Sequence, residues 1–305
     1  MELISSGQNP KIKQLLALQE KSSLRRETGL FVVEGRRELE HCLEAGYEID
    51  TLFICPELQG ERLDTAPSGV RPTGSPHHLL PQAVPPLPNH GSPGNLRFSG
   101  TSRGCYVPQG QYPAASRTIQ ITKEVYSKVA YRGSTEGVIA EVKAKALGLK
   151  DLQLKENPVI VVLEGVEKPG NLGAVLRSAD AAGADAVLVC DPLTDLYNPN
   201  LIRASIGAIF TVPTVACSSE EAIAWLKAKG ISILTAQLQD SSLYYDTPMG
   251  GPVAIVMGTE STGLTQQWRT AADAHIRIPM LGRLDSLNVS VSAAILLFEA
   301  LRQRQ

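Results

Sequence analysis

The feature that most constrains the fold is a series of six short apolar runs in the second half of the chain, separated by segments of helical periodicity. Such runs are typical of strands buried on both faces of a parallel sheet, with helices as the crossovers. The sequence therefore predicts an α/β domain from about residue 157 to 305 that ends in a long helix from about Asn288. The predicted strands cover residues 159–165, 185–190, 211–216, 232–237, 252–258 and 275–280.

A second, smaller α/β unit is predicted within residues 1–150. Its first part contains a basic helical segment, a strand at 31–35, an amphipathic helix at 36–46 and a strand at 51–55. Helical and strand patterns return at about 122–130 and 137–142, respectively. We interpret these later elements as the completion of the same small unit.

A segment of different composition interrupts the small unit at about 60–117. Ten of the chain's twenty prolines fall between Pro67 and Pro113, and Asp and Glu are absent between Thr65 and Arg117. Such a stretch buries too little apolar surface to offset the entropy lost on ordering. We therefore interpret it as an inserted, largely irregular segment. Its three histidines are weak evidence for a metal site: His77, His78 and His90.

Composition excludes several classes of protein. With 29 basic and 31 acidic residues the net charge is −2, which excludes a polycation that binds nucleic acid through bulk charge. The 5% aromatic content disfavours a base-stacking platform. The five cysteines form no CxxC pair or Cys/His cluster, so we expect neither a disulfide framework nor a metal site. The chain lacks a signal-peptide core and any apolar stretch of membrane-spanning length, so we expect a cytoplasmic protein.

Ligands of open parallel sheets bind at the carboxyl ends of the strands, and the first predicted strand ends in an unusual segment. There, Pro169 and Gly170 turn the chain, and Asn171 is placed to cap a helix that runs to Gly183. Arg177 lies off the apolar stripe of this helix. On the pattern alone, a capped surface helix with a solvated arginine is the simpler interpretation. The glycine spacing matches neither the dinucleotide fingerprint nor the P-loop.

Two further strand ends carry glycines or polar side chains. The segment IVMGTESTGLT has Gly258 and Gly263 on either side of Glu260, where glycines let the backbone approach a ligand closely. The segment IPMLGRLDSLN offers Ser286 and Asn288 just before the final helix. Turn geometry and helix capping explain each segment equally well when it is judged alone.

Together and in this order, the three segments resemble the SpoU (TrmH-like) family of RNA ribose 2′-O-methyltransferases, which belongs to the SPOUT superfamily. The resemblance covers essentially all of residues 158–305. The stretch FVVEGRRELEHCLEAG also resembles the family's small substrate-binding domain, whereas the Pro-rich segment departs from the family pattern. The matching motifs are Asn171-x-Gly173-x3-Arg177, Gly258-Thr-Glu-x2-Gly263-Leu and Ile278-Pro-Met-x5-Ser286-Leu-Asn.

The resemblance implies a parallel sheet with a deep trefoil knot, S-adenosylmethionine as the cofactor, and a homodimer with its active site at the subunit interface. It implies that Arg177 is essential; because arginine stays protonated, a role in orienting a phosphate or stabilising an alkoxide is easier than a role as base. The other implied active-site positions are Asn171, Glu260, Ser286 and Asn288. The implied cofactor-binding residues are Met257, Gly258, Gly263, Ile278, Met280 and Leu287.

Basic residues concentrate in the N-terminal region, although the net charge of the whole chain is −2. Lysines and arginines that meet phosphates bind RNA with a salt-dependent and largely sequence-independent affinity. A solvated helix face with interleaved glutamates is the alternative interpretation. The candidate RNA-binding residues are Lys11, Lys13, Arg25, Arg26, Arg36 and Arg37.

The sequence thus favours an S-adenosylmethionine-dependent RNA methyltransferase acting on a ribose 2′-hydroxyl, and family analogy favours 23S ribosomal RNA. Two alternatives stay open: a tRNA 2′-O-methyltransferase, and a non-catalytic RNA-binding ribosome-assembly factor with the same fold. A nicotinamide-dependent oxidoreductase is disfavoured, because the glycine fingerprint of dinucleotide-binding domains is missing.

Overall fold

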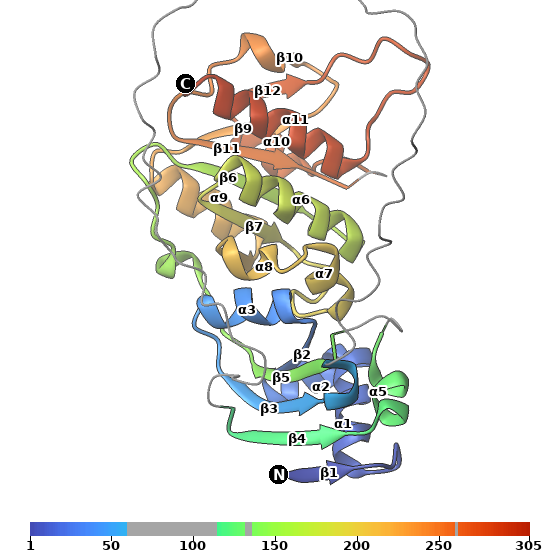
Figure 1. Ribbon diagram of the computed structural model, residues 1–305. Helices are drawn as coiled ribbons and strands as arrows, with labels where there is room; N and C mark the ends of the chain where they lie inside the picture. Colours follow the sequence, from blue (N-terminus) through green and yellow to red (C-terminus); the bar gives the residue numbers. More distant parts are fainter. Residues whose placement is uncertain (60–114, 132–135, 260–261) are drawn as a thin grey trace, which may run out of the picture.

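The computed structural model describes residues 1–59, 115–131, 136–259 and 262–305, which form two sheets at opposite ends of the molecule (Figure 1). The predicted insertion at 60–117 falls almost entirely outside the described residues, as do its three histidines. Within the part that is described, no helix combines the length and the apolar character needed to cross a membrane.

The N-terminal sheet is mixed and has the strand order β1–β4–β3–β5–β2. Strand β5 runs antiparallel to β2 and β3, whereas β4 runs parallel to β1 and β3. Helices α1 and α5 cover one face, and α3 covers the face that looks toward the second sheet (Figure 1). The elements are β1 (Glu2–Ile4), α1 (Pro10–Glu20), α2 (Ser22–Thr28), β2 (Leu30–Glu34), α3 (Arg36–Glu44), β3 (Ile49–Ile54), α4 (Pro56–Gln59), β4 (Arg117–Ile121), α5 (Lys123–Val129) and β5 (Val138–Lys143).

The C-terminal sheet is entirely parallel, with the order β10–β12–β9–β11–β6–β7–β8. This confirms the predicted α/β class. Helices α6 and α11 lie side by side on one face, and α9 and α10 cover the other (Figure 1). The elements are β6 (Val159–Glu164), α6 (Pro169–Ala182), β7 (Ala186–Cys190), α7 (Pro199–Ala204), α8 (Ala208–Thr211), β8 (Thr214–Cys217), α9 (Ser219–Ala228), β9 (Ser232–Ala236), β10 (Ser242–Leu243), β11 (Val253–Met257), α10 (Gln266–Ala271), β12 (Ala274–Arg277) and α11 (Val289–Arg302).

Strand β6 shows why the predicted strands read as unbroken apolar runs. Val161 and Leu163 face the core under α6 and α11, whereas Ile160 and Val162 face the core under α9 and α10. Successive side chains of a strand point to opposite faces, so a sheet covered on both faces requires apolar residues at every position. Only the last residue of β6, Glu164, is polar, and it is buried as well.

The order of the strands in the C-terminal sheet contains a reversal. From β6 the chain moves outward to β7 and β8, then crosses to the other side of β6 to form β9. Strand β11 then enters between β9 and β6 and pairs with both. Ligands of open α/β sheets bind outside the carboxyl ends of strands at such a reversal.

An aromatic cluster joins the two sheets. Phe31 of β2 stacks on Tyr197 with ring centroids 4.3 Å apart, and Tyr47 and Phe210 pack around the pair. One hydrophobic core therefore continues from the small sheet to the face that α6 and α11 cover.

Glu141 on β5 makes the stability of the N-terminal sheet sensitive to pH. Its side chain is buried, and its Oε1 atom has no hydrogen-bond partner among the described residues. Burial, with a smaller contribution from Asp50, raises the pKa of Glu141 from 4.5 to about 7. Folding therefore takes up a proton in the window between these values, and the free energy of unfolding falls as the pH rises through it.

We expect Glu141→Gln to be more stable than the wild type by roughly 2 kcal/mol at pH 8 and nearly equal to it at pH 4.5, because glutamine stays neutral. Urea denaturation followed by circular dichroism at both pH values measures the difference. Glu20→Gln, at an exposed position of α1, is the matched control and should keep the wild-type pH dependence. A Glu141→Gln variant that loses stability with pH as the wild type does would contradict this account.

Candidate active site

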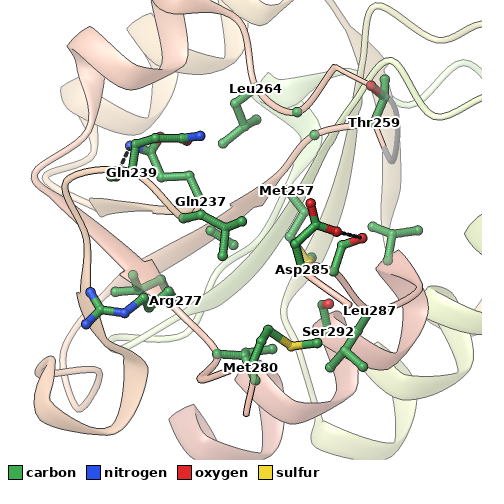
Figure 2. Close-up of a pocket in the computed structure, with 18 of the residues that line it drawn as sticks. Gln237, Gln239, Met257, Thr259, Leu264, Arg277, Met280, Asp285, Leu287 and Ser292 are labelled. Atoms are coloured by element: carbon green, nitrogen blue, oxygen red, sulfur yellow. Dashed lines mark hydrogen bonds between the residues drawn. The ribbon is translucent and has the colours of Figure 1, made fainter. Parts of the chain in front are cut away.

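A pocket of about 370 Å³ lies at the carboxyl ends of β9, β11 and β12, beside the strand reversal (Figure 2). Three chain segments form its walls: the end of β9, the loop after β11, and the loop between β12 and α11. The structure places every residue predicted to hold the cofactor on these walls, namely Met257, Gly258, Gly263, Ile278, Met280 and Leu287. Their role in binding stays a prediction.

Several residues that line the pocket were not predicted from the sequence, among them Gln237, Leu264 and Arg277. Leu264 lies across the pocket from Met280, which was predicted, and Gln237 lies on a third side (Figure 2). The end of β9 could have been found, because the rule that ligands bind at the carboxyl ends of parallel strands applies to it as well. The segment after that strand, Gln237 to Gln239, has no glycine or motif to draw attention to it.

The loop after β11 folds back tightly on itself. A Cβ atom at Gly258 would lie 2.3 Å from the carbonyl carbon of Gly263 and 2.6 Å from the amide nitrogen of Leu264. The amide of Gly263 donates to the carbonyl of Thr259 at 3.1 Å, which closes the turn. Only glycine fits at position 258, so backbone rather than side chain forms this wall of the pocket. Glu260, a predicted active-site residue, lies outside the described residues.

Asn171 and Asn288 meet beside the pocket. The side-chain amide of Asn288 donates to Oδ1 of Asn171 at 3.1 Å, so the structure brings these two predicted residues together. Asn288 also caps α11 by accepting from the amide of Ser290 at 3.0 Å. The predicted capping role of Asn171 is wrong, because α6 begins earlier, at Pro169, and Lys168 occupies the N-cap position.

A smaller cavity of about 140 Å³ adjoins the first. Asn171 and Lys168 line it, and it shares the residues Gly258, Thr259 and Val289 with the larger pocket. The two cavities therefore meet at the loop after β11. Ser286 lines the larger pocket, where its hydroxyl lies 3.3 Å from Oδ1 of Asp285.

Arg177 lies away from the other predicted active-site residues. It is six residues beyond Asn171 on α6, a rise of about 9 Å at ~1.5 Å per residue. Its side chain is exposed and lines neither cavity. Among the described residues of this chain, the structure therefore joins Asn171 to Asn288 but does not join Arg177 to them.

Gly173, the glycine of the first motif, is a packing residue. A Cβ atom there would lie 2.6 Å from the Cβ of Ala204 and 2.8 Å from the backbone of Ser205. Helix α7 therefore packs directly on the backbone of α6, which holds α6 in place beside the pocket.

The predicted RNA-binding residues differ in how accessible they are to a phosphate. Arg25 is buried, and its guanidinium donates to Asp195 at 2.6 Å and to the carbonyl of Leu18 at 2.6 Å. The structure therefore contradicts its assignment to RNA, because a buried, paired guanidinium is not accessible to a phosphate. Lys11 pairs with Glu2 at the surface and Arg36 is half-buried. The side chains that are exposed are Lys13, Arg26 and Arg37.

Comparison with protein-family models gives two matches. Residues 158–298 match the SpoU rRNA Methylase family, and residues 9–76 match an MRM3-like substrate binding domain.

Curated relatives match over most of their own length. The chain is 38% identical over 191 residues to the 23S rRNA (guanosine-2′-O-)-methyltransferase RlmB of Vibrio parahaemolyticus, covering 61% of this chain and 77% of that protein. It is 40% identical over 178 residues to RlmB of Photobacterium profundum, covering 56% and 73%. The chain belongs to the SpoU rRNA methylase family.

Solved structures of RNA methyltransferases superimpose on nearly the whole length of this SpoU protein. A crystal structure of an RNA 2′-O ribose methyltransferase superimposes with a TM-score of 0.73 at 35% identity, covering 99% of both chains. An AdoMet-bound rRNA methyltransferase from Sinorhizobium meliloti superimposes with a TM-score of 0.75 at 27% identity, covering 99% of this chain and 97% of that one. As a member of the SpoU family, this protein is an RNA ribose 2′-O-methyltransferase.

We expect Gly173→Ala to destabilise this SpoU protein by about 1–3 kcal/mol, because the added methyl group overlaps α7 and the overlap exceeds the helix-propensity gain of about 1 kcal/mol. Gly170→Ala in the same helix is the matched control, since a Cβ there meets nothing within 4 Å. Thermal unfolding of both variants measures the effect. Equal melting temperatures for the two would show that the α6–α7 contact does not require glycine.

Proposed function

We propose that this protein transfers a methyl group from S-adenosylmethionine to a ribose 2′-hydroxyl of 23S ribosomal RNA in the bacterial cytosol. The observation that carries the proposal is the pocket beside the strand reversal, because the second and third family motifs line it and Asn171 of the first lines the adjoining cavity. Relatives named as 23S rRNA (guanosine-2′-O-)-methyltransferases and an AdoMet-bound neighbour support the same reaction. The named relatives make guanosine the target nucleoside that we favour.

The pocket suits S-adenosylmethionine in size and in character. Its volume of about 370 Å³ falls within the range of about 300–1,000 Å³ that is usual for small-molecule sites. Backbone at Gly258 and Gly263 and apolar side chains such as Met257 share its walls with polar side chains that include Gln237 and Asp285. When bound, the cofactor supplies the sulfonium methyl group.

We assign the smaller cavity to the acceptor ribose. It shares Gly258, Thr259 and Val289 with the cofactor pocket, so groups in the two cavities are close neighbours. The Asn171–Asn288 pair fixes the first turns of α6 and α11 relative to each other at this cavity. Positioning of two reactants in this way supplies much of the acceleration of a methyl transfer.

We propose that Arg177 acts on the pocket of the partner subunit in a homodimer. Its exposed position away from the cavities of its own protomer supports this arrangement. Helix α11 offers a surface for dimerisation, since Val291 and Phe298 lie seven residues apart and are 47% and 48% exposed. Leu281 and Leu284, in the loop before α11, are more exposed still. Such an apolar surface is typical of a protein interface.

The chain divides into two domains with different proposed roles. We propose residues 1–150, interrupted by the insertion at about 60–117, as the substrate-binding domain and 157–305 as the methyltransferase domain with the deep trefoil knot of the superfamily. Lys13, Arg26 and Arg37 are exposed and are the basic residues that we retain for phosphate contacts. The match to an MRM3-like substrate binding domain supports this division.

We expect Arg177→Ala to reduce methyl transfer to 23S rRNA by at least ~100-fold, as removal of a transition-state donor does in other enzymes, and to leave S-adenosylmethionine affinity nearly unchanged. Radiolabelled methyl transfer measures the first quantity and calorimetry measures the second. Near-normal turnover by the variant would refute the role of Arg177.

A mixed dimer tests whether Arg177 acts in trans. Gly258→Ala should lack a working pocket, because the added Cβ collides with the backbone of Gly263. A heterodimer of Arg177→Ala and Gly258→Ala regains one intact site only if the arginine serves the partner's pocket. Restored transfer supports the proposal, whereas an inactive heterodimer places Arg177 in its own protomer's site.

A further inference from the structure

The methyltransferase sheet contains a buried carboxylate that the proposed reaction does not use. Glu164 is the last residue of β6 and is 5% exposed, at the carboxyl end of the strand next to β11. A buried carboxylate costs free energy unless hydrogen bonds satisfy it, and an apolar residue would continue the run of β6 more cheaply. Its presence therefore calls for a role that an apolar side chain cannot fill.

The carboxylate holds the end of the loop that lines the cofactor pocket. Oε2 of Glu164 accepts from the amide of Thr265 at 2.9 Å, and Oε1 accepts from the hydroxyl of Thr265 at 2.6 Å. Thr265 directly follows Gly263 and Leu264, which line the pocket. Thr265 is also the N-cap residue of α10, yet its hydroxyl makes no capping bond because it is turned to Glu164.

A second layer of hydrogen bonds holds this end of the sheet around Glu164. The hydroxyl of Ser219 lies 3.4 Å from Oε1 of Glu164 and donates to Asp191 at 2.6 Å. The indole of Trp268 in α10 donates to the same hydroxyl at 2.9 Å. The start of α9, the end of β7 and helix α10 are thereby tied to the end of β6.

The loop after β11 is thus fixed at both ends. The loop begins directly after Met257, which pairs with Leu163 of β6, and its last residue, Thr265, is bonded to Glu164. Between these points the turn is closed by the backbone bond from Gly263 to Thr259. A loop that forms a ligand site with its backbone must be held in one conformation before binding, because ordering it later costs affinity.

We propose that Glu164 is a positioning residue, which holds residues 262–265, at the end of the loop after β11, in the conformation that binds S-adenosylmethionine. The proposal rests on the assignment of the larger pocket to that cofactor. It predicts an effect on cofactor affinity from a residue that does not line the pocket.

Thr265 offers the sharpest test, because its side chain is exposed and its replacement need not disturb the core. Thr265→Val removes the hydroxyl that donates to Glu164, whereas Thr265→Ser keeps it. We expect S-adenosylhomocysteine to bind about 10-fold more weakly to Thr265→Val, as expected for loss of a hydrogen bond to a charged group, and normally to Thr265→Ser. Calorimetry on the full-length protein measures both dissociation constants.

Glu164→Gln tests the carboxylate itself, and Asp185→Asn is its matched control. Asp185 is also buried and also accepts from backbone amides, those of Val159 and Lys155, but at the opposite end of the sheet. Glu164→Gln should weaken S-adenosylhomocysteine binding about 10-fold or more, while Asp185→Asn should lower the melting temperature without changing the affinity.

Hydrogen exchange of the ligand-free protein separates this proposal from the cofactor assignment. The amides of residues 262–265 should exchange faster in Thr265→Val and Glu164→Gln than in Thr265→Ser and Asp185→Asn. Unchanged exchange and affinity in both altered proteins would overturn the role of Glu164. A wild-type protein that binds no S-adenosylhomocysteine would instead refute the cofactor assignment, and the exchange comparison would still decide whether Glu164 holds the loop.

Discussion

The hydrogen-bond ladder that places β11 between β9 and β6 is the constraint on which the candidate site depends. It brings the loop after β11 beside the end of β6 and the start of α6, which lie about 90 residues earlier in the sequence. The loop after β12 then closes the pocket from the other side. Three motifs that are far apart in the chain thus meet at one edge of the sheet, and each contributes a wall or a contact.

The contact between the two sheets fixes the position of the N-terminal sheet relative to the C-terminal sheet. Phe31 and Tyr197 stack across it, and the buried Arg25–Asp195 pair lies nearby in the chain, with side chains 4% and 16% exposed. Removal of one partner from such a pair leaves an uncompensated buried charge, so the pair favours one arrangement of the domains. The two sheets are therefore held in one arrangement relative to each other.

Periodicity predicted the strands of the C-terminal sheet well, because burial on both faces demands apolar residues throughout, as in β6. It missed β1 and β4, which are short strands of the N-terminal sheet, and the two-residue strand β10 of the C-terminal sheet. It also began β8 too early, because Thr211 ends a helix. The motifs located the pocket residues, since glycines such as Gly258 mark close backbone approach. The side-chain partners of buried polar residues could not be predicted from the sequence. Arg25 bonds to a residue 170 positions away, and Glu164 bonds to a residue 101 positions away.

The most direct test of methyl transfer to 23S ribosomal RNA is a map of 2′-O-methylated nucleotides in total RNA from cells with and without this gene. We expect one ribose in 23S ribosomal RNA to lose its methyl group in the deleted cells and to regain it when the gene is restored. Loss of a mark in tRNA instead, or a methylation map that does not change, would contradict it.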